Sequence, residues 1–148
     1  MAFQFPLEAI LRLRRGLERM ERLKLESLAS EQSRAKRELE SITEQSMESR
    51  RRLQERMLLE TIGSELRFEA GRMDTAAAAQ RALKIRIVEL EQLRRMQVQV
   101  YTSARQSREA LESLRDKKFE VYRQELLRRE QQGLDDLFLM RQNLLRDE

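Results

Sequence analysis

The chain has 148 residues, of which 38% are charged and 5% aromatic, with one Pro, four Gly and no Trp, Cys or His. This composition excludes disulfides, cysteine-ligated metals and thiol chemistry, and it removes histidine, the commonest general base and metal ligand. The 30 basic and 26 acidic residues give a net charge of +4. Because the two signs are interspersed, they indicate the solvated surface of long helices and not a compact enzyme.

The N-terminal segment predicts neither export nor membrane insertion. Residues 1–10 contain two Phe and a Pro, but they lack the basic start and continuous apolar run of a secretion signal. No apolar run approaches the ~20 residues that a membrane-spanning helix needs. We therefore expect the protein in the cytosol.

A first helix is predicted over about residues 6–62. Pro6 suits the first turn of a helix, where a missing N–H costs nothing, and Glu8 places negative charge near the positive end of the helix dipole. Apolar or small residues then recur in steps of three and four, with Gln32 as the polar exception, at Leu25, Leu28, Ala35, Leu39, Ile42, Ser46, Ser49 and Leu53. This spacing predicts the contact line, or seam, of a coiled coil.

Upstream of this seam the pattern predicts a change of register. Leu13, Leu17 and Met20 keep the three-four spacing, but they meet the register of Leu28 only through a slip of one position. A slip of this kind predicts a local change of supercoil.

The turn between two helices is predicted within residues 63–74, near Gly63. Gly63, Ser64, Gly71 and Asp74 cluster there, and both Ser64 and Asp74 are candidate N-caps. The second helix is therefore expected over about residues 75–145, with a start at residue 65 as the alternative.

A second seam follows the turn. Its polar interruptions are Arg86, Gln97 and Lys118, and its other members are Ala76, Ala79, Leu83, Leu90, Leu93, Val100, Ala104, Ser107, Leu111, Leu114 and Val121. Two seams predict two partner helices. The expected fold is all-α, with two long helices forming an antiparallel coiled-coil hairpin, and residues 1–148 as a single coiled-coil domain.

The second helix is predicted to be the longer one, so that its end extends past the first. This end is rich in apolar residues, notably Leu126, Leu127, Leu134, Leu137, Phe138, Leu139 and Met140. Leu137 to Met140 carry too many apolar groups for one seam position. Surplus apolar surface of this kind indicates a partner-binding site, with local packing as the alternative.

The sequence argues against both catalysis and nucleic-acid binding. The run Arg50 to Arg52 points to three faces of a helix, and the cluster Arg12, Arg14, Arg15, Arg19 and Arg22 has no aromatic residues interleaved for base stacking. The carboxylate pairs Glu38 with Glu40 and Asp135 with Asp136 diverge on a helix and cannot share one substrate. There is no phosphate-binding loop and no metal-ligand spacing, so we expect no catalysis, no cofactor, no metal and no nucleic acid.

Two stretches of the sequence resemble a known family. Residues 110–125 read ALESLRDKKFEVYRQE and residues 128–137 read RREQQGLDDL. They carry a leucine pair, a basic pair, Tyr-Arg, and then Glu-Gln before Leu-Asp-Asp. This order resembles the C-terminal signature of the FliJ family of flagellar protein export. Residues 3–14, FQFPLEAILRLR, are similar to the start of many members.

The resemblance implies a non-catalytic stalk in the bacterial flagellar type III export apparatus. A FliJ-like chain would form an antiparallel coiled coil similar to the rotor stalk of rotary ATPases and insert in the pore of the hexameric flagellar export ATPase. It would also contact the export gate membrane protein and export chaperones, with no small-molecule substrate. Its expected location is cytoplasmic and peripheral, at the cytoplasmic face of the inner membrane at the flagellar base.

Carried onto this sequence, the resemblance implies two sets of contact residues. The helix ends would enter the ATPase ring, and the candidates are Phe3, Phe5, Leu7, Leu11, Lys117, Lys118, Tyr122, Arg123, Asp135, Asp136, Leu137, Phe138 and Met140. The gate contact would map near the turn, on one helical face formed by Phe68, Arg72, Ala76, Ala79 and Leu83.

Two other functions remain open from the sequence. One is a homo-oligomeric coiled-coil scaffold, in which the seams pair between chains and the protein is a spacer. The other is the equivalent stalk of a virulence type III secretion system, which differs from the flagellar one only in its end signatures.

Overall fold

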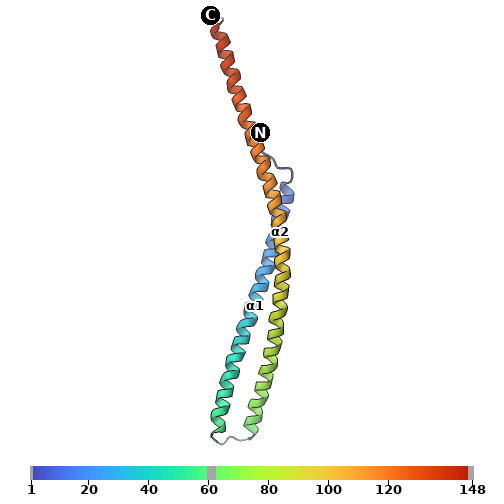
Figure 1. The fold of residues 1–148 in the computed structure, drawn as a ribbon, viewed down its shortest axis with the longest axis vertical. Helices are drawn as coiled ribbons and strands as arrows, with labels where there is room; N and C mark the ends of the chain where they lie inside the picture. The colour runs from blue at the N-terminus through green and yellow to red at the C-terminus, as the bar shows by residue number, and fades with distance from the viewer. Residues whose placement is uncertain (1, 60–62, 147–148) are drawn as a thin grey trace. The chain divides into compact units, whose positions relative to one another are not determined.

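The fold consists of two long helices in a computed structural model that describes residues 2–59 and 63–146. Helix α1 covers Glu8–Met57 and helix α2 covers Gly63–Arg146 (Figure 1). The two helices pack against each other, and the described residues contain no strand. The predicted all-α helical hairpin is thereby confirmed. Neither helix combines the length and apolarity that crossing a membrane requires, within the part of the chain searched.

The start of α1 agrees closely with the prediction. The amide of Glu8 donates to the carbonyl of Phe5 at 3.1 Å, and the amide of Leu11 donates to the carbonyl of Leu7 at 2.9 Å. Pro6 lies just before this first turn, where its ring does not remove a helix hydrogen bond. α1 ends at Met57. The remainder of the predicted first helix, up to residue 62, includes residues 60–62, which lie outside the described residues.

The second helix begins earlier than the sequence predicts. α2 starts at Gly63, before either expected start, so residues 63–74 are helical and not a turn. Gly71 and Asp74 lower helix propensity by only about 1 kcal/mol or less each. Leu66 and Met73 in the same segment are half-buried, so tertiary packing outweighs the weak local preference against helix.

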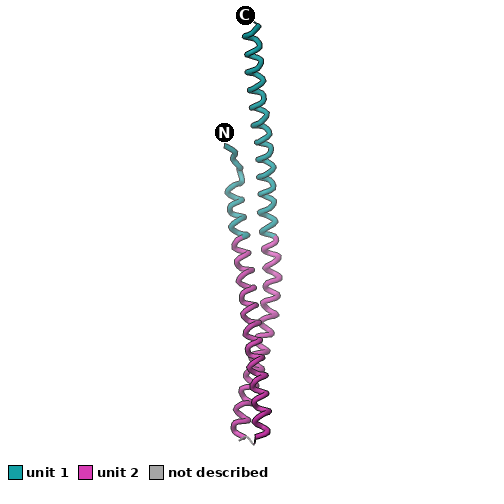
Figure 2. The backbone as a smooth tube through the Cα atoms, turned by 90° about the vertical axis from the view of Figure 1, so that its left-hand side faces the viewer, with its two compact units in different colours: residues 1–18, 103–148 teal, residues 19–102 magenta. Residues whose placement is uncertain are grey.

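The chain divides into two compact units. Unit 1 contains Met1–Glu18 with Ser103–Glu148, and unit 2 contains Arg19–Thr102 (Figure 2). Each unit therefore takes part of both helices, which run through the two units without a break.

Unit 2 is a helical hairpin with a narrow core. Every residue predicted for the first seam, Gln32 included, is half-buried or buried. Leu90 of α2 is only 1% exposed, and Gln32 is 5% exposed. The Gln32 side-chain oxygen accepts a hydrogen bond from Arg94 Nη1 at 3.3 Å. The buried Gln32 thus has a hydrogen-bond partner on the facing helix, and this hydrogen bond offsets the cost of burying its polar side chain.

Unit 1 pairs the start of α1 with α2 and leaves the rest of α2 unpaired. Leu11 is fully buried, and Phe5 in the segment before α1 is also buried. From Arg123 to Arg146 every residue of α2 is exposed. Figure 1 shows this part of α2 continuing beyond the N-terminus. We call residues 123–146 the overhang.

The predicted slip of register in the first helix is wrong. Leu13, Leu17 and Met20 are exposed, whereas Leu11, Glu18 and Glu21 lie in the seam. The register of Leu25 therefore continues back to the start of α1. It passes through Glu21, Glu18 and Leu11, in steps of four, three and seven residues. The physical reason is that the two glutamates find polar partners on α2, so that the seam tolerates them. Glu18 pairs with Arg108, and Glu21 accepts from Gln97.

The predicted second seam is displaced by one position at several points. Leu93, Val100, Leu114 and Val121 are exposed. The side that faces α1 instead carries the residues one position away, namely Ile87, Arg94, Tyr101, Arg108, Arg115 and Tyr122, together with Leu83, Leu90, Gln97, Ala104 and Leu111. Its charged and amide members, Arg94, Gln97, Arg108 and Arg115, are paired with α1, so a search for apolar residues alone passes over them.

Candidate partner-binding site

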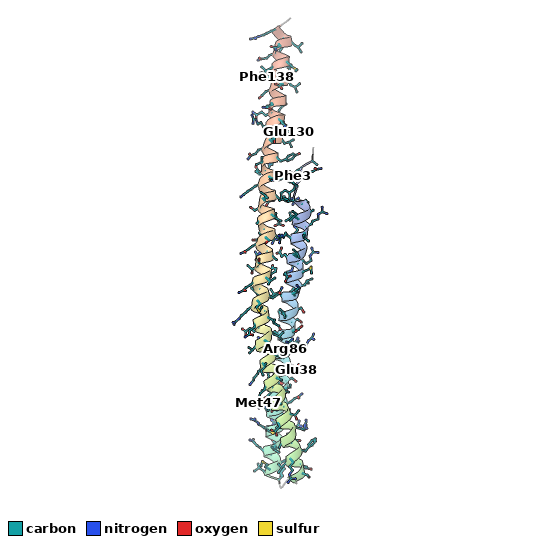
Figure 3. All side chains as sticks on the ribbon, turned by 90° about the vertical axis from the view of Figure 1, so that its right-hand side faces the viewer. Phe3, Glu38, Met47, Arg86, Glu130 and Phe138 are labelled. Atoms are coloured by element: carbon teal, nitrogen blue, oxygen red, sulfur yellow. The ribbon has the colours of Figure 1, made fainter. Side chains whose placement is uncertain are left out.

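An aromatic cluster fastens the N-terminal segment to α2. The ring of Phe3 lies 5.2 Å from that of Phe119 in an edge-on arrangement and 5.5 Å from that of Tyr122. The Lys118 ammonium lies 5.9 Å from the centre of the Phe5 ring. Such pairs stabilise by about 0.5–1.5 kcal/mol beyond the area that they bury. Figure 3 shows Phe3 beside α2, at the level where the overhang begins.

Of the predicted ATPase contacts, those from the N-terminal segment and α1 are largely taken up by packing. Phe5 and Leu11 are buried, and Phe3 and Leu7 are half-buried. A shallow cavity of about 360 Å³ remains at this point, lined by Phe3, Gln4, Phe5, Glu8 and Arg115. These residues position the helix ends, and the surface that they leave open belongs mainly to α2.

A charged network replaces apolar packing in the seam of unit 1. Arg108 binds Glu18 through two parallel contacts, Nε to Oε2 at 2.6 Å and Nη2 to Oε1 at 3.1 Å. Its Nη1 donates to Glu112 Oε2 at 2.6 Å, and Arg15 Nη2 lies 3.0 Å from Glu112 Oε1. The side chains of Glu18, Arg108 and Glu112 are mostly shielded from water. The attraction between their charges is therefore screened less than that of an ion pair on the surface.

The hydrogen bonds of this network shift the pKa values of its members. The hydrogen bond from Arg108 is the largest cause that lowers the pKa of Glu112, and the bond from Arg15 adds to it. The carboxylates of Glu18 and Glu112 raise the pKa of Arg108. In unit 2 the hydrogen bond from Gln97 is the main cause that lowers the pKa of Glu21, with Lys24 contributing. Glu21, Arg108 and Glu112 are therefore charged at neutral pH.

The remaining predicted ATPase contacts lie on α2, and most of them are open to solvent. Leu137, Phe138 and Met140 are exposed, as are the acidic residues Asp135 and Asp136. Lys117, Lys118 and Arg123 are exposed nearby on α2, and Tyr122 is half-buried under Phe3. Figure 3 shows Glu130 and Phe138 on the part of α2 that α1 does not reach. The structure places these side chains on one continuous helix and leaves all of them except Tyr122 exposed.

A groove opens between the two helices of unit 2 close to the turn. It has a volume of about 720 Å³ and is lined from α1 by Ile42, Gln45, Ser46 and Ser49, and from α2 by Arg67, Phe68, Gly71, Arg72, Met73, Thr75, Ala76 and Ala79. Small side chains on both walls keep the groove open. Phe68 is exposed at its rim, with the guanidinium of Arg72 at 6.0 Å from the ring centre.

Four of the five predicted gate contacts line this groove. Phe68, Arg72, Ala76 and Ala79 come together there, whereas Leu83 is half-buried in the seam and lies outside the lining. The sequence reasoning assigned Ser46 and Ser49 to the seam and missed that they form the opposite wall. The antiparallel pairing of the two seams contains this signal, because small residues on both helices at one level leave space between them.

The chemistry of the exposed surfaces is that of binding. Within the described ranges no three His, Cys, Asp or Glu side chains come together to hold a metal ion. The groove and the overhang offer apolar, aromatic and guanidinium groups, which are the groups enriched where proteins contact one another.

Comparison with known proteins gives one family. No curated protein and no solved structure matches the chain. The family described as "Flagellar FliJ protein" matches residues 3–144, which is nearly the whole chain and includes the aromatic cluster, the groove and most of the overhang. This family is a non-enzymatic component of flagellar protein export. The chain belongs to the FliJ family.

Proposed function

We propose that this chain is the stalk of the flagellar type III protein export apparatus. It inserts in the hexameric export ATPase and links the ATPase to the export gate membrane protein and to export chaperones, at the cytoplasmic face of the inner membrane. The observation that carries this proposal is the overhang, a helical end of α2 with exposed apolar side chains and no partner helix in the described chain. An end of this kind fits a pore that surrounds it.

The ATPase contact is formed by the side chains that packing leaves free. Leu137, Phe138 and Met140 supply apolar anchors on the overhang, and Asp135 and Asp136 supply charge beside them. Buried Phe5 and Leu11 contribute indirectly, because they hold the start of α1 on α2. Apolar anchors next to charged residues are typical of interfaces in which a few side chains carry most of the affinity.

The stalk acts on ATP hydrolysis through unequal contacts. A helix pair has no sixfold symmetry, so it touches the subunits of a hexameric ring differently. Each subunit has conformations that bind or hydrolyse ATP with different affinity, and a contact that favours one conformation shifts its population. The stalk thereby couples the sites of the ring while contributing no catalytic group.

The gate contact belongs to the groove of unit 2. Phe68 and Arg72 at its rim, with Ala76 and Ala79 along its wall, offer an apolar surface with positive charge. Leu83 supports the wall from within the seam. This groove leaves room for a segment of the gate protein to lie between the helices.

The experiment that tests the ATPase contact is a pull-down and an ATPase assay with the cognate flagellar export ATPase. The triple variant Leu137→Ser, Phe138→Ser, Met140→Ser should lose stimulation of hydrolysis while its helicity by circular dichroism stays nearly unchanged. The matched control is Ile85→Ser with Val88→Ser, two exposed apolar residues of unit 2, which should leave stimulation intact. Undiminished stimulation by the triple variant would remove the overhang from the interface.

Sedimentation of the chain alone separates the stalk from a homo-oligomeric scaffold. A folded monomer that binds and stimulates the ATPase supports the stalk, whereas a stable dimer that does not bind the ATPase supports the scaffold. Stimulation of the flagellar ATPase in preference to a virulence-system ATPase distinguishes the two kinds of secretion stalk.

A further inference from the structure

An exposed apolar stripe runs along the start of α1 in unit 1. Ile10, Leu13 and Leu17 are 44%, 61% and 37% exposed. Their spacing of three and four places them on one face of the helix. This face is not the one that contacts α2, because the contact side is occupied by Leu11, which is fully buried, and by Glu18 with its partner Arg108. The stripe is therefore an apolar surface beside the seam.

α2 widens this stripe into a face of the helix pair. The contacts of Glu8 with Arg115 at 3.3 Å and of Arg15 with Glu112 at 3.0 Å set the pairing, so Leu114 lies at the level of Ile10. Leu114 is 38% exposed. Ile10, Leu17 and Leu114 each come one residue before a seam residue, namely Leu11, Glu18 and Arg115. In an antiparallel pair, such positions on the two helices lie on the same side of the seam. Leu114 therefore adds to the apolar surface formed by Ile10 and Leu17.

The charge on this side of unit 1 is positive. Arg14 lies next to the stripe on α1, and Lys117 lies one turn after Leu114 on α2. Neither side chain has an ion-pair partner among the described residues. The other positions of α2 that share this side, 107, 110 and 121, are Ser, Ala and Val. The face thus combines apolar anchors with two cations that form no ion pair among the described residues.

We infer that Ile10, Leu13, Leu17 and Leu114 form a docking face for an amphipathic helix of a partner protein, whose apolar stripe is bordered by Asp or Glu. The three-four spacing of the anchors fits the ridges of a third helix laid along the pair. Arg14 and Lys117 select for acidic side chains beside that helix's apolar stripe. This inference is independent of the proposed stalk function, and it concerns residues other than the apolar anchors of the overhang.

The test uses the full-length chain and a library of helical peptides. The peptides carry Leu at positions in steps of three and four, with the flanking positions varied among Glu, Gln and Lys. Selection on the wild-type chain should enrich Glu at the flanks. Fluorescence anisotropy of the best peptide should then show at least tenfold weaker binding to Leu13→Ser with Leu17→Ser and several-fold weaker binding to Arg14→Glu. Binding to the wild type should weaken as salt is added.

Controls keep the test decisive. The substituted leucines are exposed, so the variant should fold, and its circular dichroism spectrum and unfolding midpoint check this. The matched pair Ile85→Ser with Val88→Ser should bind the peptide as the wild type does. Equal binding of Lys-flanked and Glu-flanked peptides, or undiminished binding to the leucine variant, would overturn the inference.

Other occupants of the face would give different results. A dimer of the wild type that Leu13→Ser with Leu17→Ser dissociates would assign the face to a second copy of the chain. Binding to anionic phospholipid vesicles that the same variant abolishes, without any selection of helical peptides, would assign it to a membrane surface. Either result would overturn the proposal of an acidic partner helix.

Discussion

At the scale of single residues, unit 1 shows that a coiled-coil seam can be built from paired charges. Arg108 contacts Glu18 and Glu112 at once, and Arg15 completes the chain of contacts. A side chain already held by one ion pair loses less conformational entropy in forming a second. Such a network favours one pairing of the helices, because a shifted α2 would separate the guanidinium from both carboxylates.

Glu112 makes this network sensitive to acid. Its pKa is lowered in the folded protein, mainly by the hydrogen bond from Arg108. Its contribution to stability is therefore fully present above the unfolded value, about 4.3, and is lost as the pH falls through the lower folded value. We predict that Glu112→Gln lowers the free energy of unfolding at pH 7 and that its difference from the wild type shrinks below about pH 4.

The measurement is urea unfolding of both proteins at several pH values between 7 and 3. A control is Glu125→Gln, whose carboxylate forms an exposed pair with Arg129 within one turn of the overhang, and which should change stability little at any pH. A Glu112→Gln difference that stays constant from pH 7 to pH 3 would contradict the prediction.

At the scale of the helices, the position of each residue relative to the seam decides its energetic role. Leu90 and Leu93 are one turn apart and chemically identical, yet Leu90 is 1% exposed and Leu93 is 44% exposed. The sequence alone assigned both to the seam. The unbroken register from Leu83 through Ile87 to Leu90 places Leu90 against α1 and Leu93 beside it.

We predict that Leu90→Ala lowers the free energy of unfolding by about 2–4 kcal/mol, since it removes a fully buried side chain and leaves a cavity. Leu93→Ala should cost less than about 1 kcal/mol, because Ala has high helix propensity and almost half of the leucine's surface already faces water. Chemical unfolding followed by circular dichroism at 222 nm measures both values. Equal losses in the two variants would mean that the seam passes between these positions.

At the scale of the whole molecule, the packed part and the overhang differ in how much of their surface is buried. The hairpin of unit 2 and the paired part of unit 1 bury side chains, whereas residues 123–146 are exposed throughout. A helix without tertiary packing gains little stability of its own. Its exposed apolar residues make sense as surface kept for a partner.

We predict that a chain ending at Tyr122 folds with nearly the unfolding midpoint of the full chain, because the deleted overhang packs against nothing in the described structure. The truncated protein should lose binding to the export ATPase, in line with the proposed function. Thermal unfolding by circular dichroism checks the first statement, and the pull-down checks the second. A midpoint lowered by many degrees would show that the overhang stabilises the rest of the chain.

The sequence by itself determined the fold class, the two helices and the start of the first one. The three-four spacing of apolar residues and the near absence of Pro and Gly impose long amphipathic helices whatever the surroundings. The first seam from Leu25 to Leu53 was predicted correctly for the same reason, since nearly all its members are apolar or small. The family followed from the end signatures and is shown by the match over residues 3–144.

Only the tertiary structure decided which side of each helix is covered. Glu18, Arg108 and Arg115 were passed over as seam residues because a single charged side chain looks unfavourable there until its partner on the other helix is known. Leu13 and Leu17 looked like core for the converse reason, since the spacing of apolar residues cannot show whether another helix lies against them. Pairing between residues far apart in the chain settles both questions, and it also creates the groove between Ser46 and Ala76.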